Sequence, residues 1–160
     1  MPPFGVAVLA RLMHLYRTHE GGTVTTRLNP YINFAEDARR ALEFYQGVFG
    51  GEMNVSTYGE AGGAEGPDAD KIMHGQLETP AGYTLMVSDA PAGMEHSAGS
   101  QISISLSGDD GDELRRYFTG LSEGGRVTMP LEKQMWGDEF GMCVDPFGIA
   151  WMVNISQPAG

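Results

Sequence analysis

The chain has 160 residues, of which 41% are hydrophobic and 19% are charged, so it is apolar enough to bury a core and is not a disordered chain. Ten Lys and Arg against 21 Asp and Glu leave a net charge of −11, which argues against a protein that binds the phosphates of nucleic acid. A single cysteine excludes an internal disulfide and favours a cytoplasmic protein, and no apolar run reaches the ~18 residues of a membrane span.

Residues 1–26 have a different pattern from the rest of the chain. Residues 6–16 could form a short helix, and Gly21-Gly22 would end it. We interpret residues 1–26 as an extension that is either flexible or packed on a partner subunit.

The regular pattern begins with a strand at residues 28–34, in which Leu28, Ile32 and Phe34 share one face. A helix follows over residues 36–49, with acidic residues in its first turn, and Gly50-Gly51 ends it. Further strands are predicted at residues 53–58, 72–79 and 83–88, with a mobile loop at 59–71 and a turn at 80–82.

The same order of elements is predicted again after residue 100. Alternation puts Ile102, Ile104 and Leu106 on the buried face of a strand at residues 101–107. A helix at 110–123 follows and ends at Gly124-Gly125. The remaining strands are predicted at residues 127–131, 140–145 and 149–155, with a turn at 146–148.

The two halves repeat each other. Pro80 and Pro146 are 66 residues apart, as are Gly82 and Gly148, and a Met-Val pair follows each glycine at the same distance. Each half is therefore one βαβββ module within a domain of residues 27–157. Module one covers about residues 27–90 and module two about residues 100–157.

This doubled pattern resembles the vicinal oxygen chelate superfamily, which holds glyoxalases, extradiol dioxygenases and bleomycin-resistance proteins, and in particular its PhnB-like branch. The segments that carry the resemblance are residues 28–34, 41–45, 49–51, 73–74, 85–89, 136–138, 140–141 and 145–151. The resemblance implies an α+β fold in which two tandem βαβββ modules form a cup-shaped, eight-stranded mixed sheet with the helices on its convex face. It also implies a homodimer.

The resemblance further indicates where metal ligands would be. Metal-dependent members place His or Glu on the first and last strand of each module, and the matching positions here are near Asn29, Met86, Gln101 and Met152. None of these is a good ligand for a divalent ion in a site of nitrogen and oxygen donors. We therefore expect a cup without metal or other cofactor, although an unusual site that uses His74 and Glu78 is conceivable.

Strand alternation selects the side chains that would line the cup. Two residues are candidates for catalysis: His74 as a general base and Asp138 beside the aromatic ring of Trp136 at the rim. Each also has a purely structural interpretation. His74 could be a hydrogen-bonded histidine within a strand, and Asp138 could be a carboxylate that caps a turn. The predicted ligand-binding residues are Tyr31, Asn33, Gln76, Glu78, Ser103, Ser105, Trp136 and Asn154.

These residues favour a protein that binds a small organic molecule, with the activity undefined. Two alternatives stay open: a metal-dependent lyase or dioxygenase, and a protein that sequesters an antibiotic or toxin. A methyltransferase is disfavoured, because no Gly-rich nucleotide-binding βαβ unit is present in the sequence.

Overall fold

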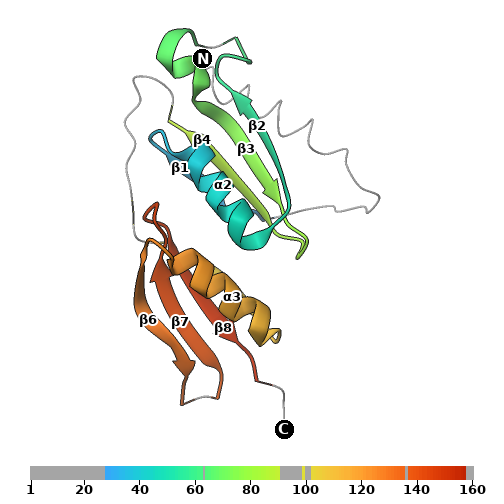
Figure 1. Ribbon diagram of the computed structural model, residues 1–160, viewed down its shortest axis with the longest axis vertical. Helices are drawn as coiled ribbons and strands as arrows, with labels where there is room; N and C mark the ends of the chain where they lie inside the picture. The colour runs from blue at the N-terminus through green and yellow to red at the C-terminus, as the bar shows by residue number, and fades with distance from the viewer. Residues whose placement is uncertain (1–27, 63, 91–98, 100–101, 136, 158–160) are drawn as a thin grey trace. The chain divides into compact units, whose positions relative to one another are not determined.

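The structure is a computed structural model that describes residues 28–62, 64–90, 99, 102–135 and 137–157 (Figure 1). These residues form two compact units: the first holds residues 28–46 and 50–90, and the second holds residues 99 and 102–157 together with residues 47–49. The predictions for residues 1–26, for Gln101 and for Trp136 lie outside the described residues. Neither helix in the described part of the chain is long and apolar enough to cross a bilayer.

Module one is a four-stranded mixed sheet with one α-helix on one face (Figure 1). The strand order is β1-β4-β3-β2, with β1 parallel to β4 and the other pairs antiparallel. Its elements are β1 (Tyr31–Phe34), α2 (Ala38–Phe49), β2 (Glu52–Thr57), a 3-10 helix (Gly66–Asp70), β3 (Ile72–Glu78) and β4 (Thr84–Asp89).

Module two has the same topology. The strand order is β5-β8-β7-β6, with β5 parallel to β8 and the other pairs antiparallel. Its elements are β5 (Ile104–Gly108), α3 (Gly111–Ser122), β6 (Arg126–Lys133), β7 (Glu139–Val144) and β8 (Ala150–Ile155). The predicted α+β fold with two tandem βαβββ modules is confirmed, while the joining of the two sheets into one cup stays a prediction.

Four local predictions were wrong. The helix expected at residues 36–49 begins at Ala38, so its first turn holds no acidic residue. Residues 59–71 are not only loop, because they contain the 3-10 helix, which has Pro67 in its first turn. The first strand begins at Tyr31 rather than at residue 28, since Pro30 has no N–H for the ladder. Ile102 lies outside β5 and is 84% exposed, because the pairing of Ile104 with Trp151 leaves only the hairpin turn opposite it.

The repeat extends to individual hydrogen bonds. In the β3–β4 turn the N–H of Thr79 donates to the carbonyl of Tyr83. In the β7–β8 turn the N–H of Asp145 donates to the carbonyl of Ile149, again four positions later. Gly82 and Gly148 close the two turns with φ of 88° and 85°, which only glycine adopts without strain. The 66-residue offset therefore describes one hairpin built twice.

The apolar face of each helix packs on its own sheet. In module one a Cβ at Gly75 would lie 3.1 Å from the Leu42 side chain, so the odd-numbered residues of β3 face α2. In module two a Cβ at Gly108 would lie 3.8 Å from Leu114, and Arg115 of α3 reaches Glu139 of β7. The face of each sheet turned away from its own helix is called the distal face below.

Candidate functional site

Five of the predicted site residues lie on the distal face of module one. Tyr31 and Asn33 are on β1, and the alternate positions of β3 carry His74, Gln76 and Glu78. The strand register places them on one face, because Tyr31 and Gln76 are both partners of Met86 on β4. Met86 and Ser88 of β4 lie on the same face.

The polar side chains of this face are linked to one another. The Tyr31 hydroxyl lies 3.0 Å from Nδ1 of His74, with the two ring centroids 5.6 Å apart. Ser88 interacts with the same hydroxyl and donates from Oγ to Oδ1 of Asn33 at 2.8 Å. One hydrogen-bonded group thus extends from β1 across β4 to β3.

The link continues along β3. Gln76 donates from Nε2 to Oε1 of Glu78 at 3.0 Å, and it also interacts with the imidazole of His74. We call these six side chains the polar network; they are Tyr31, Asn33, His74, Gln76, Glu78 and Ser88. The network runs from the fully buried imidazole of His74 to the exposed side chains of Asn33 and Glu78.

Burial determines the protonation of the network at its centre. Desolvation lowers the pKa of His74, and its interaction with Gln76 only partly opposes this. Desolvation likewise raises the pKa of Tyr31, while Ser88 acts in the other direction. A neutral imidazole therefore faces a protonated phenol, which can donate to Nδ1 in the tautomer that carries its proton on Nε2.

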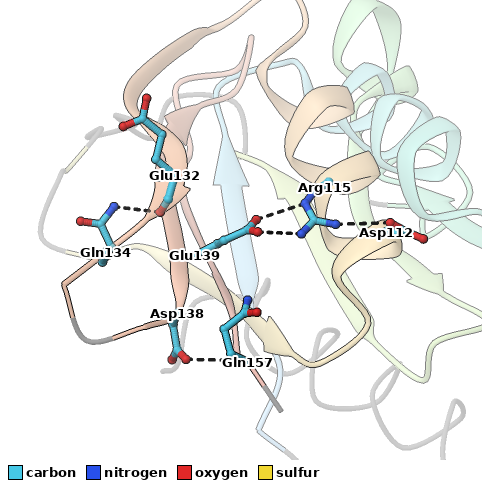
Figure 2. A network of polar contacts seen from close by, with 7 residues as sticks. All are labelled: Asp112, Arg115, Glu132, Gln134, Asp138, Glu139 and Gln157. Carbon is cyan, nitrogen blue, oxygen red and sulfur yellow. Dashed lines mark hydrogen bonds and ion pairs between the residues drawn. The ribbon is translucent and has the colours of Figure 1, made fainter. Parts of the chain in front are cut away.

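Two other predicted residues meet in module two. Both Asp138 and Asn154 are half-buried, and the Asn154 Nδ2 donates to the Asp138 carboxylate at 3.0 Å. The second oxygen of Asp138 accepts from the backbone N–H of Gln157 at 3.2 Å, as Figure 2 shows. Asp138 thus orients Asn154 and holds the chain after β8. Ser105 lies on the same face as Asn154 and is exposed, while Ser103 precedes β5 and is half-buried.

The strongest ion pair of module two is on the other side of its sheet. Arg115 of α3 contacts Glu139 of β7 through two bonds of 2.7 and 3.1 Å and Asp112 at 3.3 Å (Figure 2). The hydrogen bond raises the pKa of Arg115 and lowers that of Glu139. This pair joins helix to sheet and faces away from Asn154.

The described residues do not fit a divalent metal. They contain no group of three or more His, Cys, Asp or Glu close enough to hold an ion. The positions that the family would use include Met86 and Met152, whose thioethers do not suit a site of nitrogen and oxygen donors.

Two buried carboxylates have roles that sequence reasoning missed. Asp89, at the end of β4, accepts from the backbone N–H groups of Ala38 and Ile72 at 3.0 and 2.8 Å, so it caps α2 in place of Asp37. Asp145 accepts from two backbone N–H groups of its own turn and from Nε1 of Trp151 at 2.9 Å. The sequence signal available for both residues was an aspartate at the end of an apolar strand.

The comparisons with known proteins agree with this architecture. The family model described as the Glyoxalase/Bleomycin resistance protein/Dioxygenase superfamily matches residues 27–153. "Protein YjdN" of Escherichia coli K12 is 31% identical over 142 residues, which are 80% of this chain and 94% of that protein.

Solved structures show the same fold. Protein PA1353 from Pseudomonas aeruginosa is 36% identical and superposes with a TM-score of 0.74 over 83% of this chain and 99% of that one. A protein from Bacillus cereus, described as a putative 3-demethylubiquinone-9 3-methyltransferase and PhnB protein, is 22% identical with a TM-score of 0.67 over 82% of this chain and 100% of its own. The resemblance predicted from the sequence is confirmed: the chain belongs to the Glyoxalase/Bleomycin resistance protein/Dioxygenase superfamily.

Proposed function

We propose that this protein binds a small organic ligand at the polar network of module one, and that it does so without a divalent metal. The observation that carries the proposal is the network itself, in which six polar side chains from three strands share one face and are linked to one another. Burying a connected set of polar side chains on a sheet face costs desolvation free energy. The hydrogen bonds within the set hold its donors and acceptors in fixed positions, as ligand recognition requires.

The network would recognise an oxygen-bearing ligand. The half-buried Tyr31 keeps its proton, and in the tautomer in which Nδ1 of His74 donates to the phenol oxygen, Tyr31 can donate this proton to a carbonyl or hydroxyl oxygen of the ligand. Asn33 and Glu78 are exposed and offer further contacts at the two ends of the network. His74 lies behind the Tyr31 hydroxyl, so it orients the phenol from the buried side.

Binding without conversion is the function that the geometry supports best, and catalysis is the second candidate. Burial favours the neutral imidazole of His74, which can accept a proton through Tyr31. Both oxygens of Asp138 accept bonds within module two, so we propose that this residue positions Asn154 rather than transfers a proton. A sequestering protein would need binding only.

A ligand screen tests the proposal. Thermal-shift measurements with metabolites and antibiotics, with and without divalent metals, would give hits whose affinity is then measured by calorimetry. Tyr31→Phe removes one donor and should weaken a hit about tenfold, and His74→Gln should weaken it similarly. Tyr83→Phe, outside the network, is the matched control. Unchanged affinity in both network variants would contradict the proposal.

Metal analysis tests the second part of the proposal. Protein purified without a His tag should contain no stoichiometric Zn, Mn, Ni or Fe, and chelation should leave the affinity for a hit unchanged. About one equivalent of any of these metals, removed together with binding, would instead support the metal-dependent alternative.

We further propose a cytoplasmic homodimer, as the family resemblance implies. β6 supports it, since this edge strand is exposed along most of its length and carries apolar side chains such as Val127, which is 47% exposed. Light scattering after size exclusion should give twice the chain mass at micromolar concentration, and a monomer there would contradict the proposal.

A further inference from the structure

The edge strand β6 carries one extra residue on each side of Met129. Two steps along β6, from Val127 to Met129, match one step along β7, and three steps, from Met129 to Glu132, match two. A bulge leaves its extra residue unpaired, and Pro130, within the second bulge, has no N–H for the ladder. Met129 and its partner Met142 are therefore a single register pair between two interruptions of the ladder.

The side chain of Met129 supports this single pair. Register partners share one face of a sheet with their Cβ atoms about 5 Å apart, so the thioether of Met129 lies beside that of Met142, which in turn lies beside Met152. Met129 is 41% exposed, and the other two are half-buried. Because β6 ends the strand order of its sheet, it pairs with β7 alone. The middle of β6, residues 128–131, therefore depends on the packing of Met129 more than on ladder hydrogen bonds.

An accessible thioether is open to oxidation by a peroxide. The sulfur attacks one oxygen of hydrogen peroxide, the O–O bond breaks, and the sulfur keeps that oxygen as a sulfoxide while the other leaves as water. The sulfur thereby loses the two electrons that the peroxide gains. Met73 and Met86 of module one are 4% and 5% exposed, so burial protects them, whereas Met129 is accessible. Pairing of two β6 edges in the proposed homodimer joins backbones, and the sheet face that carries Met129 stays open.

We propose that Met129 is a redox-sensitive residue, and that its oxidation by a peroxide releases the middle of β6 from β7. The polar sulfoxide oxygen needs hydrogen bonds, and at position 129 it would lie against the apolar side chain of Met142. Reduction by two thiols, which become a disulfide while the oxygen leaves as water, restores the thioether and closes the strand. The inference goes beyond the proposed function, because it needs no ligand at the polar network.

Treatment of the wild type with hydrogen peroxide tests the proposal. Peptide mass spectrometry measures the oxidation of each methionine, and hydrogen exchange of the backbone amides measures the opening of β6. Met129 and the fully exposed Met135 should be oxidised before the buried methionines. Exchange at residues 126–133 should then become about fivefold faster, while exchange in β8 stays unchanged.

Two variants separate Met129 from general oxidation. Met129→Leu keeps an apolar side chain of similar volume without sulfur, so exchange in β6 should be as slow after peroxide treatment as before it. Met135→Leu is the matched control, since Met135 is fully exposed in the loop before β7, and this variant should respond like wild type. Methionine sulfoxide reductases for both epimers, supplied with a thiol, should restore slow exchange in the oxidised wild type.

A second measurement needs no oxidant. Met129→Gln places a polar group at the same position, and it should accelerate exchange in β6 of the untreated protein. The proposal is overturned if Met129 stays reduced while Met135 is fully oxidised, if exchange in β6 is unchanged once Met129 is oxidised, or if Met129→Leu shows the same acceleration as wild type. Tyr31→Phe should leave the response to peroxide unchanged, so a failure of the ligand-binding proposal is seen separately.

Discussion

The two modules have the same backbone and different distal faces. Gly51 and Gly125 follow the two helices, and a Cβ on either would lie 2.1 Å from a carbonyl oxygen at the end of the neighbouring strand, at Glu78 and Val144. The turns, the strand order and these close approaches are repeated because they determine the chain path. The side chains of the distal faces do not determine the chain path, and the two modules differ in these side chains.

The divergence is clearest along the central row of each distal face. In module one Asn54, Gln76 and Met86 are successive register partners, and the neighbouring row holds His74. The corresponding positions of module two hold Met129, Met142 and Met152. One copy of the sheet has thus become a polar, hydrogen-bonded surface and the other a thioether surface.

The helix sides of the two sheets also differ. Arg115 and Glu139 form the ion pair of module two, and the positions 74 and 66 residues earlier are Ala41 and Met73, both buried. Each module therefore joins helix to sheet with different chemistry at equivalent positions. Three experiments test these differences between the two modules.

The largest effect is expected in the repeated hairpin turn. Asp145→Ala leaves two backbone donors and the buried Trp151 indole without their acceptor, and it should lower the free energy of unfolding by about 3–5 kcal/mol. Thr79→Ala, the equivalent change in module one, removes one bond to the Tyr83 N–H and should cost about 1 kcal/mol. Chemical denaturation measures both, and equal losses would show that the two turns are stabilised alike.

A moderate effect is expected from His74 when the pH is lowered. Its pKa is lower in the folded than in the unfolded state, so the unfolded chain takes up a proton first as the pH falls below about 6.5. The free energy of unfolding should therefore fall with pH from that point, and stability from this group is fully present above it. His74→Gln should flatten the dependence relative to wild type by up to one proton. If the free energy of unfolding depends on pH in the same way in His74→Gln and in wild type, the pKa of His74 is not lowered by folding as expected.

The smallest effect is expected from the exposed ion pair. Arg115→Ala removes both bonds to Glu139, but solvent and salt screen such pairs. The unfolding midpoint at physiological salt should stay close to that of wild type, with a larger difference at low salt. A large loss at physiological salt would show that the pair is integral to the attachment of α3, unlike the apolar residues at the equivalent positions of module one.

Strand alternation alone predicted which residues of module one share the distal face. It worked for Tyr31, His74 and Gln76 because side chains alternate strictly between the faces of a paired strand. It failed for Ile102, since alternation does not show where the partner strand ends. The role of Asp89 was missed as well, because an aspartate at a strand end does not show that it caps a helix that begins 51 residues earlier in the chain.

The duplicated module, its turns and the faces of its strands can be predicted from the sequence alone. These follow from local rules, namely glycine at positive φ, proline without an N–H and the period of two along a strand. Which polar residues meet depends instead on the order of the strands in the folded sheet. Tyr31 and His74 are 43 residues apart, and their hydrogen bond exists because β1 and β3 lie on either side of β4. The same registers bring the three methionines of module two into one row.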